Sequence, residues 1–220
     1  MDSINSYLLE VRRVLSNMPA NALREVVLLL HQAWKQGKQV FIFGNGGSAS
    51  TASHMANDLS KATIVPGKRR MRVIALTDNI SIITAWANDG SFEDIFKEQL
   101  QNLLQPGDIV IGISASGNSP NVLRAMEFSR LRGALNIGWT GLSGGELREL
   151  VDVCIHCPTD DIGIVESVHL VMDHLVTNEL RRCMGAGVTA SGPDQEDHNQ
   201  GTNGNEPSLV TVPRAVSRSA

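Results

Sequence analysis

The hydrophobic and polar positions of this chain follow two different spacings. In residues 1–37 the apolar side chains recur every three or four positions, as Leu8, Val11 and Leu15 do, and this spacing predicts helices. From residue 38 onward, short runs of consecutive apolar residues alternate with helical patterns, and each short run predicts a buried strand. The expected strands are 39–43, 71–77, 109–113, 134–140 and 151–157. This alternation predicts an α/β fold with a doubly wound, five-stranded parallel sheet flanked by helices.

Residues 1–37 are expected to form two helices, because Pro19 and Asn21 interrupt the helical pattern. The second helix has an apolar face of its own, made of Val26, Leu29, Leu30 and Trp34. Helices this apolar, placed before the first strand, need another surface to pack on. We expect that surface to be an oligomer interface, and packing within the monomer is the alternative.

The composition changes at Val188, after which few apolar residues and no periodic pattern occur. Such a stretch is typical of a disordered tail. Domains average about 150 residues, so the simplest expectation for the rest of this 220-residue chain is a single domain. The expected organisation is therefore N-terminal helices in 1–37, one domain in 38–187 and a disordered tail in 188–220.

The stretch that follows the strand at 109–113 has the features of an anion-binding site. Hydroxyl and glycine residues end the strand abruptly and lead into a helical pattern: Ser114, Ser116, Gly117, Asn118, Ser119 and Pro120. A turn between a strand and a helix offers free backbone N–H groups and the positive end of the helix dipole. One serine here would be explained as a helix cap. Three serines in six residues favour a phosphate site.

A second turn of this kind, Gly44-Asn45-Gly46-Gly47-Ser48, follows the first expected strand. Glycines there let the backbone approach a ligand closely. Dinucleotide-binding folds also use a glycine-rich turn, but the G-x-G-x-x-G spacing is missing here.

Two groups of polar side chains lie on expected helices. His54 and Asp58 are four residues apart and therefore share one helical face. On the late helix, 161–184, four polar side chains interrupt the apolar stripe: Glu166, His169, Asp173 and His174. A single pair of this kind is often a surface pair, and a single helical histidine often belongs to the core. The position of His54 and Asp58 below a ligand turn favours a functional role.

Composition excludes several classes of partner. A net charge of −4 and a pI of about 5.8 give no basic footprint for nucleic acid. No apolar run reaches the roughly 18–20 residues that span a bilayer, and no secretion signal is visible. Cys154 and Cys157 would lie on opposite faces of a strand, which disfavours a shared metal. We therefore expect a cytoplasmic protein without nucleic-acid or membrane partners.

Several of these motifs together resemble the sugar isomerase (SIS) domain family, and most of all its phosphoheptose isomerases. The resemblance covers about residues 5–184 and implies a single SIS domain. It rests on the turn 44–48, His54, Asn88-Asp89, the stretch 114–119, and the late helix with Glu166 and His174.

The resemblance implies a role for each matching position. The phosphate would be held by Ser114, Ala115, Ser116 and Ser119. The sugar would contact Asn45, Gly46, Gly47, Ser48, Asn88, Asp89 and Glu166. A divalent metal, usually zinc, would be bound by His54, Asp58, Glu166 and His174, with Asp58 and His174 as the catalytic acid and base. A homotetramer with sites at subunit boundaries is also implied, in agreement with the apolar N-terminal helices.

Three positions depart from the family pattern. The metal-binding carboxylate, usually Glu, is the shorter Asp58; the usual Gln on the late helix is Glu166; and a Thr of the phosphate turn is Ala115. The first two changes keep oxygen ligands that suit zinc or manganese. Glu166 and His174 are eight residues apart, about 12 Å along a helix, so they converge on one metal only by leaning together or across subunits.

The implied reaction converts sedoheptulose 7-phosphate into D-glycero-D-manno-heptose 7-phosphate through a metal-assisted enediol. Isomerisation of a related ketose phosphate is an alternative that the departures leave open. Non-catalytic relatives that bind the replication initiator are another, but they tend to lack the metal-binding carboxylate, which is present here as Asp58. A phosphosugar-sensing regulator is disfavoured because no DNA-binding segment accompanies the domain.

Overall fold

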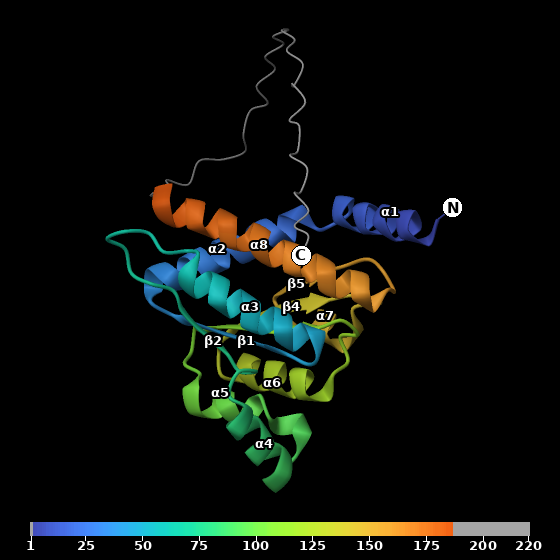
Figure 1. Ribbon diagram of the computed structural model, residues 1–220. Coiled ribbons are helices and arrows are strands. Elements are labelled where there is room, and N and C mark those ends of the chain that lie inside the picture. Colours follow the sequence, from blue (N-terminus) through green and yellow to red (C-terminus); the bar gives the residue numbers. More distant parts are fainter. Residues whose placement is uncertain (1, 187–220) are drawn as a thin grey trace, which may run out of the picture. The chain divides into compact units, whose positions relative to one another are not determined.

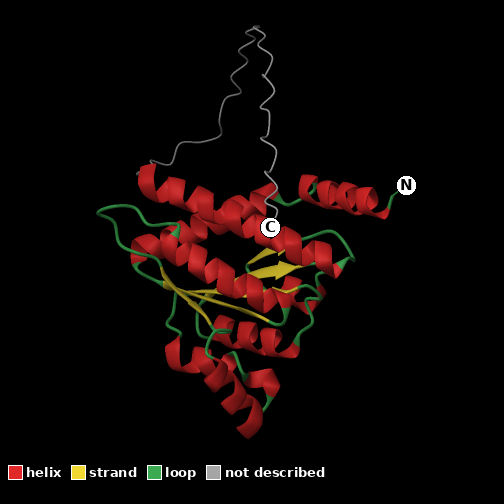
Figure 2. Ribbon diagram, in the orientation of Figure 1, coloured by secondary structure: helices red, strands yellow, loops and turns green. Residues whose placement is uncertain are grey.

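The computed structural model describes residues 2–186, which form one parallel sheet between two layers of helices (Figure 1; Figure 2). Met1 and residues 187–220, including the expected tail, lie outside the described residues. The strands are β1 (Gln39–Gly44), β2 (Arg72–Ala75), β3 (Ile109–Ser114), β4 (Leu135–Thr140) and β5 (Val153–His156). The helices are α1 (Ser3–Ser16), α2 (Ala20–Gln36), α3 (Gly47–Lys61), α4 (Ile80–Asp89), the 3-10 helix η1 (Phe92–Asp94), α5 (Lys97–Leu103), α6 (Pro120–Leu131), α7 (Gly145–Leu150) and α8 (Ile162–Ala186).

All five strands run parallel, in the order β2-β1-β3-β4-β5. The order reverses between β1 and β3, which pair side by side up to Gly44 and Ile113. From this edge β1 continues into α3 on one face of the sheet, and β3 continues into α6 on the other (Figure 1). Doubly wound sheets bind ligands in the crevice at such a reversal, so the two glycine and serine turns lie where a ligand is expected.

Each face of the sheet has its own hydrophobic core. Ile42 is fully buried in the core that β1 shares with α2, α3 and α8, and its neighbour Phe43 points into the other. In that second core Phe43 stacks on Phe96, with ring centroids 4.8 Å apart. Helices α3 and α8 therefore pack side by side on one face, whereas α4, α5 and α6 lie on the opposite face (Figure 1).

The predicted sheet is confirmed, with all five strands present and parallel. The two edge strands β2 and β5 are shorter than the apolar runs 71–77 and 151–157. Each of them pairs with one neighbour only, β2 with β1 over Arg72–Ala75 and β5 with β4 over Val153–His156. Cys154 and Cys157 are free thiols, and burial raises the pKa of Cys157 to about 11, which makes it unreactive.

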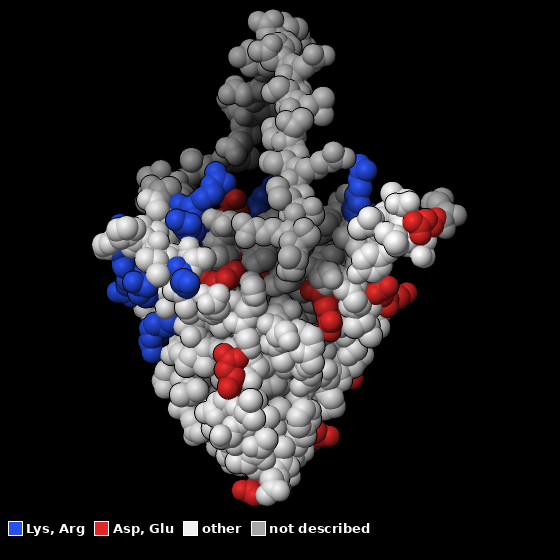
Figure 3. Space-filling view, in the orientation of Figure 1, with Lys and Arg blue, Asp and Glu red and all other residues white. Residues whose placement is uncertain are grey.

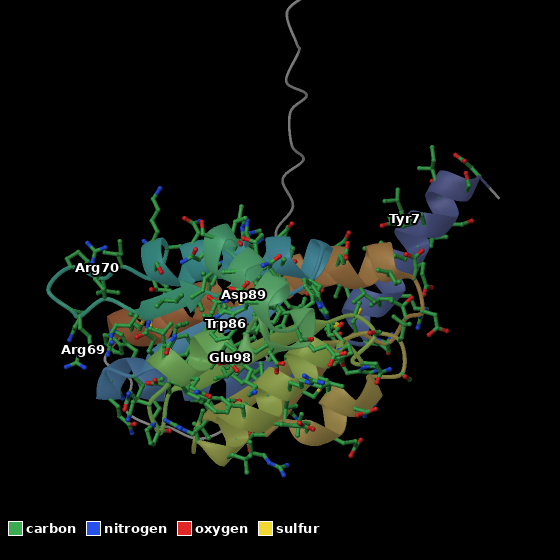
Figure 4. The ribbon with its side chains drawn as sticks, turned by 90° about the horizontal axis from the view of Figure 1, so that it is seen from below. Tyr7, Arg69, Arg70, Trp86, Asp89 and Glu98 are labelled. Atoms are coloured by element: carbon green, nitrogen blue, oxygen red, sulfur yellow. The ribbon has the colours of Figure 1, made fainter. Side chains whose placement is uncertain are left out.

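The two N-terminal helices are also confirmed, and Pro19 separates them. The apolar face of α2 packs inside the chain, because Val26 and Leu30 are fully buried and Trp34 donates a 2.8 Å hydrogen bond to the Arg69 carbonyl. For α2 the alternative of packing within the monomer therefore holds. Helix α1 differs: in Figure 4, Tyr7 marks its position at the margin of the other described elements, and several apolar side chains there are exposed.

Basic side chains gather on one side of the face seen in Figure 3, where the loop between α3 and β2 lies. That loop carries Lys68, Arg69 and Arg70, all exposed, and Figure 4 shows the two arginines on it. The loop leads into the amino end of β2, whereas both ligand turns lie at the carboxyl ends of the strands. Among residues 2–186, no helix has both the length and the apolar character that crossing a bilayer requires.

Candidate active site

Residues 114–119, here called the serine turn, bring three hydroxyl groups together at the end of β3. The Ser114 hydroxyl lies 3.1 Å from the hydroxyl of Ser119 and 3.5 Å from that of Ser116. The Gly117 N–H donates to the Ser114 hydroxyl at 3.1 Å. Gly117 has a φ of +69°, and a Cβ there would collide with the carbonyl of Gly144, so this position requires glycine.

The hydroxyl of Ser119 is not used to cap the following helix. Ser119 is the N-cap residue of α6, with Pro120 as the first helical residue, yet its side chain makes no capping hydrogen bond. It faces Ser114 instead. Pro120 has no N–H, and the N–H groups of Val122 and Leu123 bond to the Ser119 carbonyl, so the 12-residue α6 presents mainly its positive dipole end to the three hydroxyls. This arrangement suits an anion, and it disfavours the explanation of Ser119 as a cap.

The glycine turn after β1 is fastened directly to the start of α6. Asn45 and Asn121 exchange two side-chain hydrogen bonds, of 2.8 and 2.9 Å, and Asn121 is almost fully buried. Sequence analysis missed Asn121, because an asparagine just after Pro120 is also typical of a helix start. The paired amides place the glycine turn beside the serine turn, so the two predicted ligand turns adjoin one another.

The remaining residues of these turns are also placed. Gly44 needs to be glycine, because a Cβ would lie 2.7 Å from the Ile113 carbonyl and 2.8 Å from the Ser48 side chain. Gly46, with a φ of +56°, is the N-cap residue before α3 and has open space around it. Ser48 is buried beneath the turn, and Ala115 packs its methyl group against the core on the α3 and α8 face. Of these residues, Gly46 has the most room for a ligand.

Glu166 lies over the glycine turn. Its carboxylate occupies the space in front of Gly47, where any Cβ would collide with it. Because Gly47 is the first residue of α3, this places Glu166 at the level where the helix begins. The structure therefore brings Glu166 to the turn that the resemblance assigns to the sugar.

His54 and Asp58 lie about two and three turns farther along α3, where they meet His174 of α8, so that three predicted metal ligands come together. The Nε2 atoms of His54 and His174 are 3.0 Å apart. The Asp58 Oδ2 atom lies 3.5 Å from Nε2 of His54 and 3.6 Å from Nε2 of His174. Both imidazoles are partly exposed, whereas Asp58 keeps only 17% of its side chain exposed. The group is thus open to a ligand on one side.

A fourth side chain joins this group, and it is Asp173. One ligand atom each from His54, Asp58, Asp173 and His174 lie within 4.8 Å of one another, and these residues are here called the His/Asp group. Among the described residues, Glu166 is not part of it. Asp173 is fully buried, and burial, followed by the nearby Asp58, raises the pKa of Asp173 to about 7. The sequence signal for Asp173 was its interruption of the apolar stripe of α8.

The donors of the His/Asp group fit a zinc ion. Two imidazole nitrogens and carboxylate oxygens are ligands that zinc prefers, and ligands about 2.1 Å from a tetrahedral ion lie about 3.4 Å from one another. The three measured separations, 3.0, 3.5 and 3.6 Å, bracket that value. In addition, Oδ2 of Asp173 is buried and has no hydrogen-bond partner in the part of the chain that the structure describes, as expected for an atom that awaits a cation.

Asn88 and Asp89 are not brought to either turn within this chain. They lie at the end of α4, on the sheet face opposite α3 and α8, and Figure 4 shows Asp89 near Trp86 on that helix. The one side-chain hydrogen bond found for them among residues 2–186 joins the Asn88 amide to the Asp89 carboxylate at 2.7 Å. Their predicted contact with the sugar stays a prediction.

Comparisons with known proteins agree with this geometry. The SIS domain model matches residues 6–141. A phosphoheptose isomerase of Geotalea daltonii is 41% identical over 157 residues, 71% of this chain and 81% of the relative. The lincomycin biosynthesis protein LmbN of Streptomyces lincolnensis is 36% identical over 181 residues, 78% of this chain and 66% of the relative. The structure of a phosphoheptose isomerase from Francisella tularensis superposes with a TM-score of 0.76 at 28% identity, covering 82% of this chain and 97% of that one.

Proposed function

This chain belongs to the SIS domain family, and on that premise we propose that it is an aldose–ketose isomerase that converts sedoheptulose 7-phosphate into D-glycero-D-manno-heptose 7-phosphate. One observation carries the proposal. The Asn45–Asn121 amide pair fastens a cluster of three serine hydroxyls to the start of the helix whose later turns hold His54 and Asp58. The proposed phosphate site is thus connected through the start of α3 to the proposed acid/base group.

The serine turn holds the phosphate end of the substrate. Ser114, Ser116 and Ser119 donate hydroxyl hydrogens, and the positive dipole end of α6 adds attraction without a full positive charge. The binding energy gained here fixes the position of the distant carbons C1 and C2. At the glycine turn, the backbone near Gly46 and the carboxylate of Glu166 orient the sugar hydroxyls.

Asp58 and His174 move the protons. The Asp58 carboxylate takes a proton from C1 of the ketose, the C1=C2 double bond forms, and His174 gives a proton to the C2 oxygen. In the second half Asp58 returns the proton to C2, and His174 takes one from the C1 hydroxyl, so that the aldehyde forms at C1. The side chains lie 3.6 Å apart, close enough to serve two neighbouring carbons.

A divalent metal, which we propose to be zinc, fits at His54, Asp58 and His174. When bound, it would supply Lewis-acid polarisation of the two reacting oxygens, so that the C1 proton that Asp58 takes is more acidic.

Turnover of sedoheptulose 7-phosphate, measured together with the metal content of the purified chain, tests the proposal. We expect formation of the aldose phosphate and a bound divalent metal. A chain that carries neither metal nor isomerase activity contradicts the proposal and favours the non-catalytic adaptor that binds the replication initiator. Asp58, at the position of the metal-binding carboxylate, supports the enzyme over the adaptor.

A related ketose phosphate is the second candidate substrate. Two observations favour it: Glu166 adds a negative charge beside the glycine turn, and one relative at 36% identity is named for lincomycin biosynthesis. A panel of ketose phosphates of different chain length separates the two candidates. The proposal of sedoheptulose 7-phosphate requires that it be turned over with a higher kcat/KM than the others.

We also propose that the chain works as a homotetramer in the cytoplasm. Helix α1 supports an assembly, because Ile4, Leu8 and Leu9 are 67%, 59% and 54% exposed on an otherwise amphipathic helix. Light scattering on the purified chain measures the assembly. Replacing Leu8 and Leu9 by Ser is expected to dissociate it, and an unchanged mass would contradict this role for α1.

A further inference from the structure

A buried carboxylate oxygen on α8 has no hydrogen-bond partner within residues 2–186. Asp173 is 0% exposed, and its Oδ1 accepts a 3.3 Å hydrogen bond from the Thr177 hydroxyl. Its Oδ2 is buried with no hydrogen-bond partner among the described residues. An unpaired carboxylate oxygen away from water is costly unless a donor or a cation meets it. The position of Asp173 therefore points to a missing positive group.

The Asp173 carboxylate lies beside the other members of the His/Asp group. One ligand atom of Asp173 lies within 4.8 Å of those of His54, Asp58 and His174. Two carboxylates this close repel each other when both are ionised, and a divalent cation between them balances their charge. With two neutral imidazoles as the remaining ligands, the occupied site carries no net charge, which makes its burial on the α8 side acceptable.

Glu166, the residue that the family pattern puts in the ligand set, lies elsewhere. It is eight residues before His174, which is about 12 Å along a helix. Its carboxylate stands in front of Gly47, at the first turn of α3, whereas His54 and Asp58 are on later turns. Since α3 and α8 pack side by side, Glu166 is at the level of the glycine turn, and Asp173 is at the level of the His/Asp group.

We propose that Asp173, and not Glu166, completes the metal site of this chain. The inference deepens the proposed function and rests on it. Asp173 supplies a carboxylate ligand on the buried side of the site, and His54 and His174 supply imidazole ligands on its partly exposed side. Glu166 is thereby left to accept hydrogen bonds from sugar hydroxyls at the glycine turn, which distinguishes this chain's ligand set from the one that the family pattern implies.

Zinc affinity of the full chain, stripped of metal, tests this assignment. We compare the wild-type chain with Asp173→Asn and with Glu166→Ala, which removes every ligand atom at position 166 of the same helix; glutamine is avoided there because it is the family's usual metal ligand. A chromophoric chelator competes for zinc, and the visible absorption of bound cobalt reports the coordination directly. Loss of an outer partner already costs about 10–100-fold in metal affinity, so loss of a ligand is expected to cost at least about 100-fold.

We expect one zinc ion per wild-type chain, at least about 100-fold weaker binding and an altered cobalt spectrum for Asp173→Asn, and a change below about threefold for Glu166→Ala. Asp173→Ala serves as the second variant, and circular dichroism confirms that each variant is folded. Wild-type affinity and an unchanged cobalt spectrum in the Asp173 variants would overturn the assignment, as would a large loss in Glu166→Ala or no zinc binding by the wild type.

Turnover is measured in parallel, so that failure of the Asp173 assignment can be distinguished from failure of the proposed function. A chain that isomerises sedoheptulose 7-phosphate but binds zinc independently of Asp173 overturns the assignment alone. A chain that binds zinc through Asp173 but turns over no ketose phosphate overturns the proposed isomerase function alone.

Discussion

The serine turn is built from six consecutive residues, 114–119, whereas the His/Asp group joins α3 to α8 across 120 positions of the chain. In the serine turn the hydroxyls and backbone N–H groups already bond to one another, and no side chain titrates. In the His/Asp group two imidazoles and two carboxylates lie close together, and one buried carboxylate oxygen has no hydrogen-bond partner among the described residues. The serine turn forms its hydrogen bonds without a ligand, whereas we propose that a bound cation completes the His/Asp group.

This contrast assigns different work to the two regions. A rigid, uncharged cluster suits recognition of a phosphate that does not change during the reaction. A group that holds unmatched charge suits the end of the sugar where protons move. Damage to the serine turn should therefore weaken binding, and damage to the His/Asp group should slow the chemical step.

The largest effect is expected from removing the proton carriers. Asp58→Asn and His174→Gln should each lower kcat by about 10²–10⁴-fold, because each removes one side of the proton transfer. Binding of the sugar phosphate, measured by calorimetry, should change little. Glu179→Gln, on an exposed part of α8, is the control and should keep wild-type turnover. Unchanged kcat in both active-site variants would contradict the claim that the His/Asp group acts on the chemical step.

A change of pH acts on α8 and not on the serine turn, because α8 contains a buried histidine and the serine turn has no titratable side chain. His169 is fully buried against Trp139, and burial lowers the pKa of His169 to about 4. Below its unfolded pKa of about 6.5 the unfolded chain takes up a proton that the folded chain does not. This residue's contribution to folding stability is therefore present at pH 7 and is lost as the pH falls from about 6.5 to 4, by about 3 kcal/mol.

His169→Gln should remove that dependence, since glutamine does not titrate. Urea unfolding of both chains at pH 7.5 and pH 4.5 measures it, and the variant should lose less free energy of unfolding than the wild type. Parallel losses in the two chains would show that the protonation of His169 is not coupled to folding. Glutamine is chosen because it can still donate to the Thr140 carbonyl, which lies 3.2 Å from Nε2 of His169.

A smaller effect is expected at the serine turn. Ser116→Ala and Ser119→Ala each remove one hydrogen bond to a charged phosphate, worth about 1.5 kcal/mol, and should raise KM about tenfold. The value of kcat should stay within about threefold of wild type. Ser16→Ala, on the exposed side of α1, is the control. A fall in kcat without a rise in KM would mean that the turn acts on the chemical step.

The smallest effect sharpens the assignment of Asp173. Thr177→Val keeps the side-chain shape but removes the hydroxyl that donates to Oδ1 of Asp173. A hydrogen bond of about 1 kcal/mol corresponds to about fivefold weaker zinc binding, with no change in affinity for the sugar phosphate. Equal zinc affinities of the variant and the wild type would show that Thr177 does not position Asp173.

The sequence predicts the serine turn well because all of its parts are contiguous. A buried strand, three hydroxyls and a helix pattern follow one another from Ile109 to Leu131, and only local geometry is needed to place them. The sheet is equally predictable, since each strand has its own apolar run. The break at Pro19 has the same local origin.

The ligand set of the metal site is harder to predict, because it depends on how α8 is rotated against α3. Helical spacing puts Glu166, His169 and Asp173 on one stripe and cannot tell which of them faces His54. Packing decides this: His169 turns toward Trp139 in β4, Asp173 toward Asp58, and Glu166 toward Gly47. The same reason explains why the apolar face of α2, equally compatible with an interface, is buried inside the chain.

Solvent deuterium exchange tests the central claim most directly, because it follows the proton that Asp58 is proposed to move. The wild-type chain is incubated with sedoheptulose 7-phosphate in deuterated water, and the sugar is followed by NMR. We predict loss of one C1 proton from the ketose and deuterium at C2 of the aldose, with both signals absent in Asp58→Asn. No exchange at either carbon with the wild-type chain, or equal exchange in Asp58→Asn, would contradict the account.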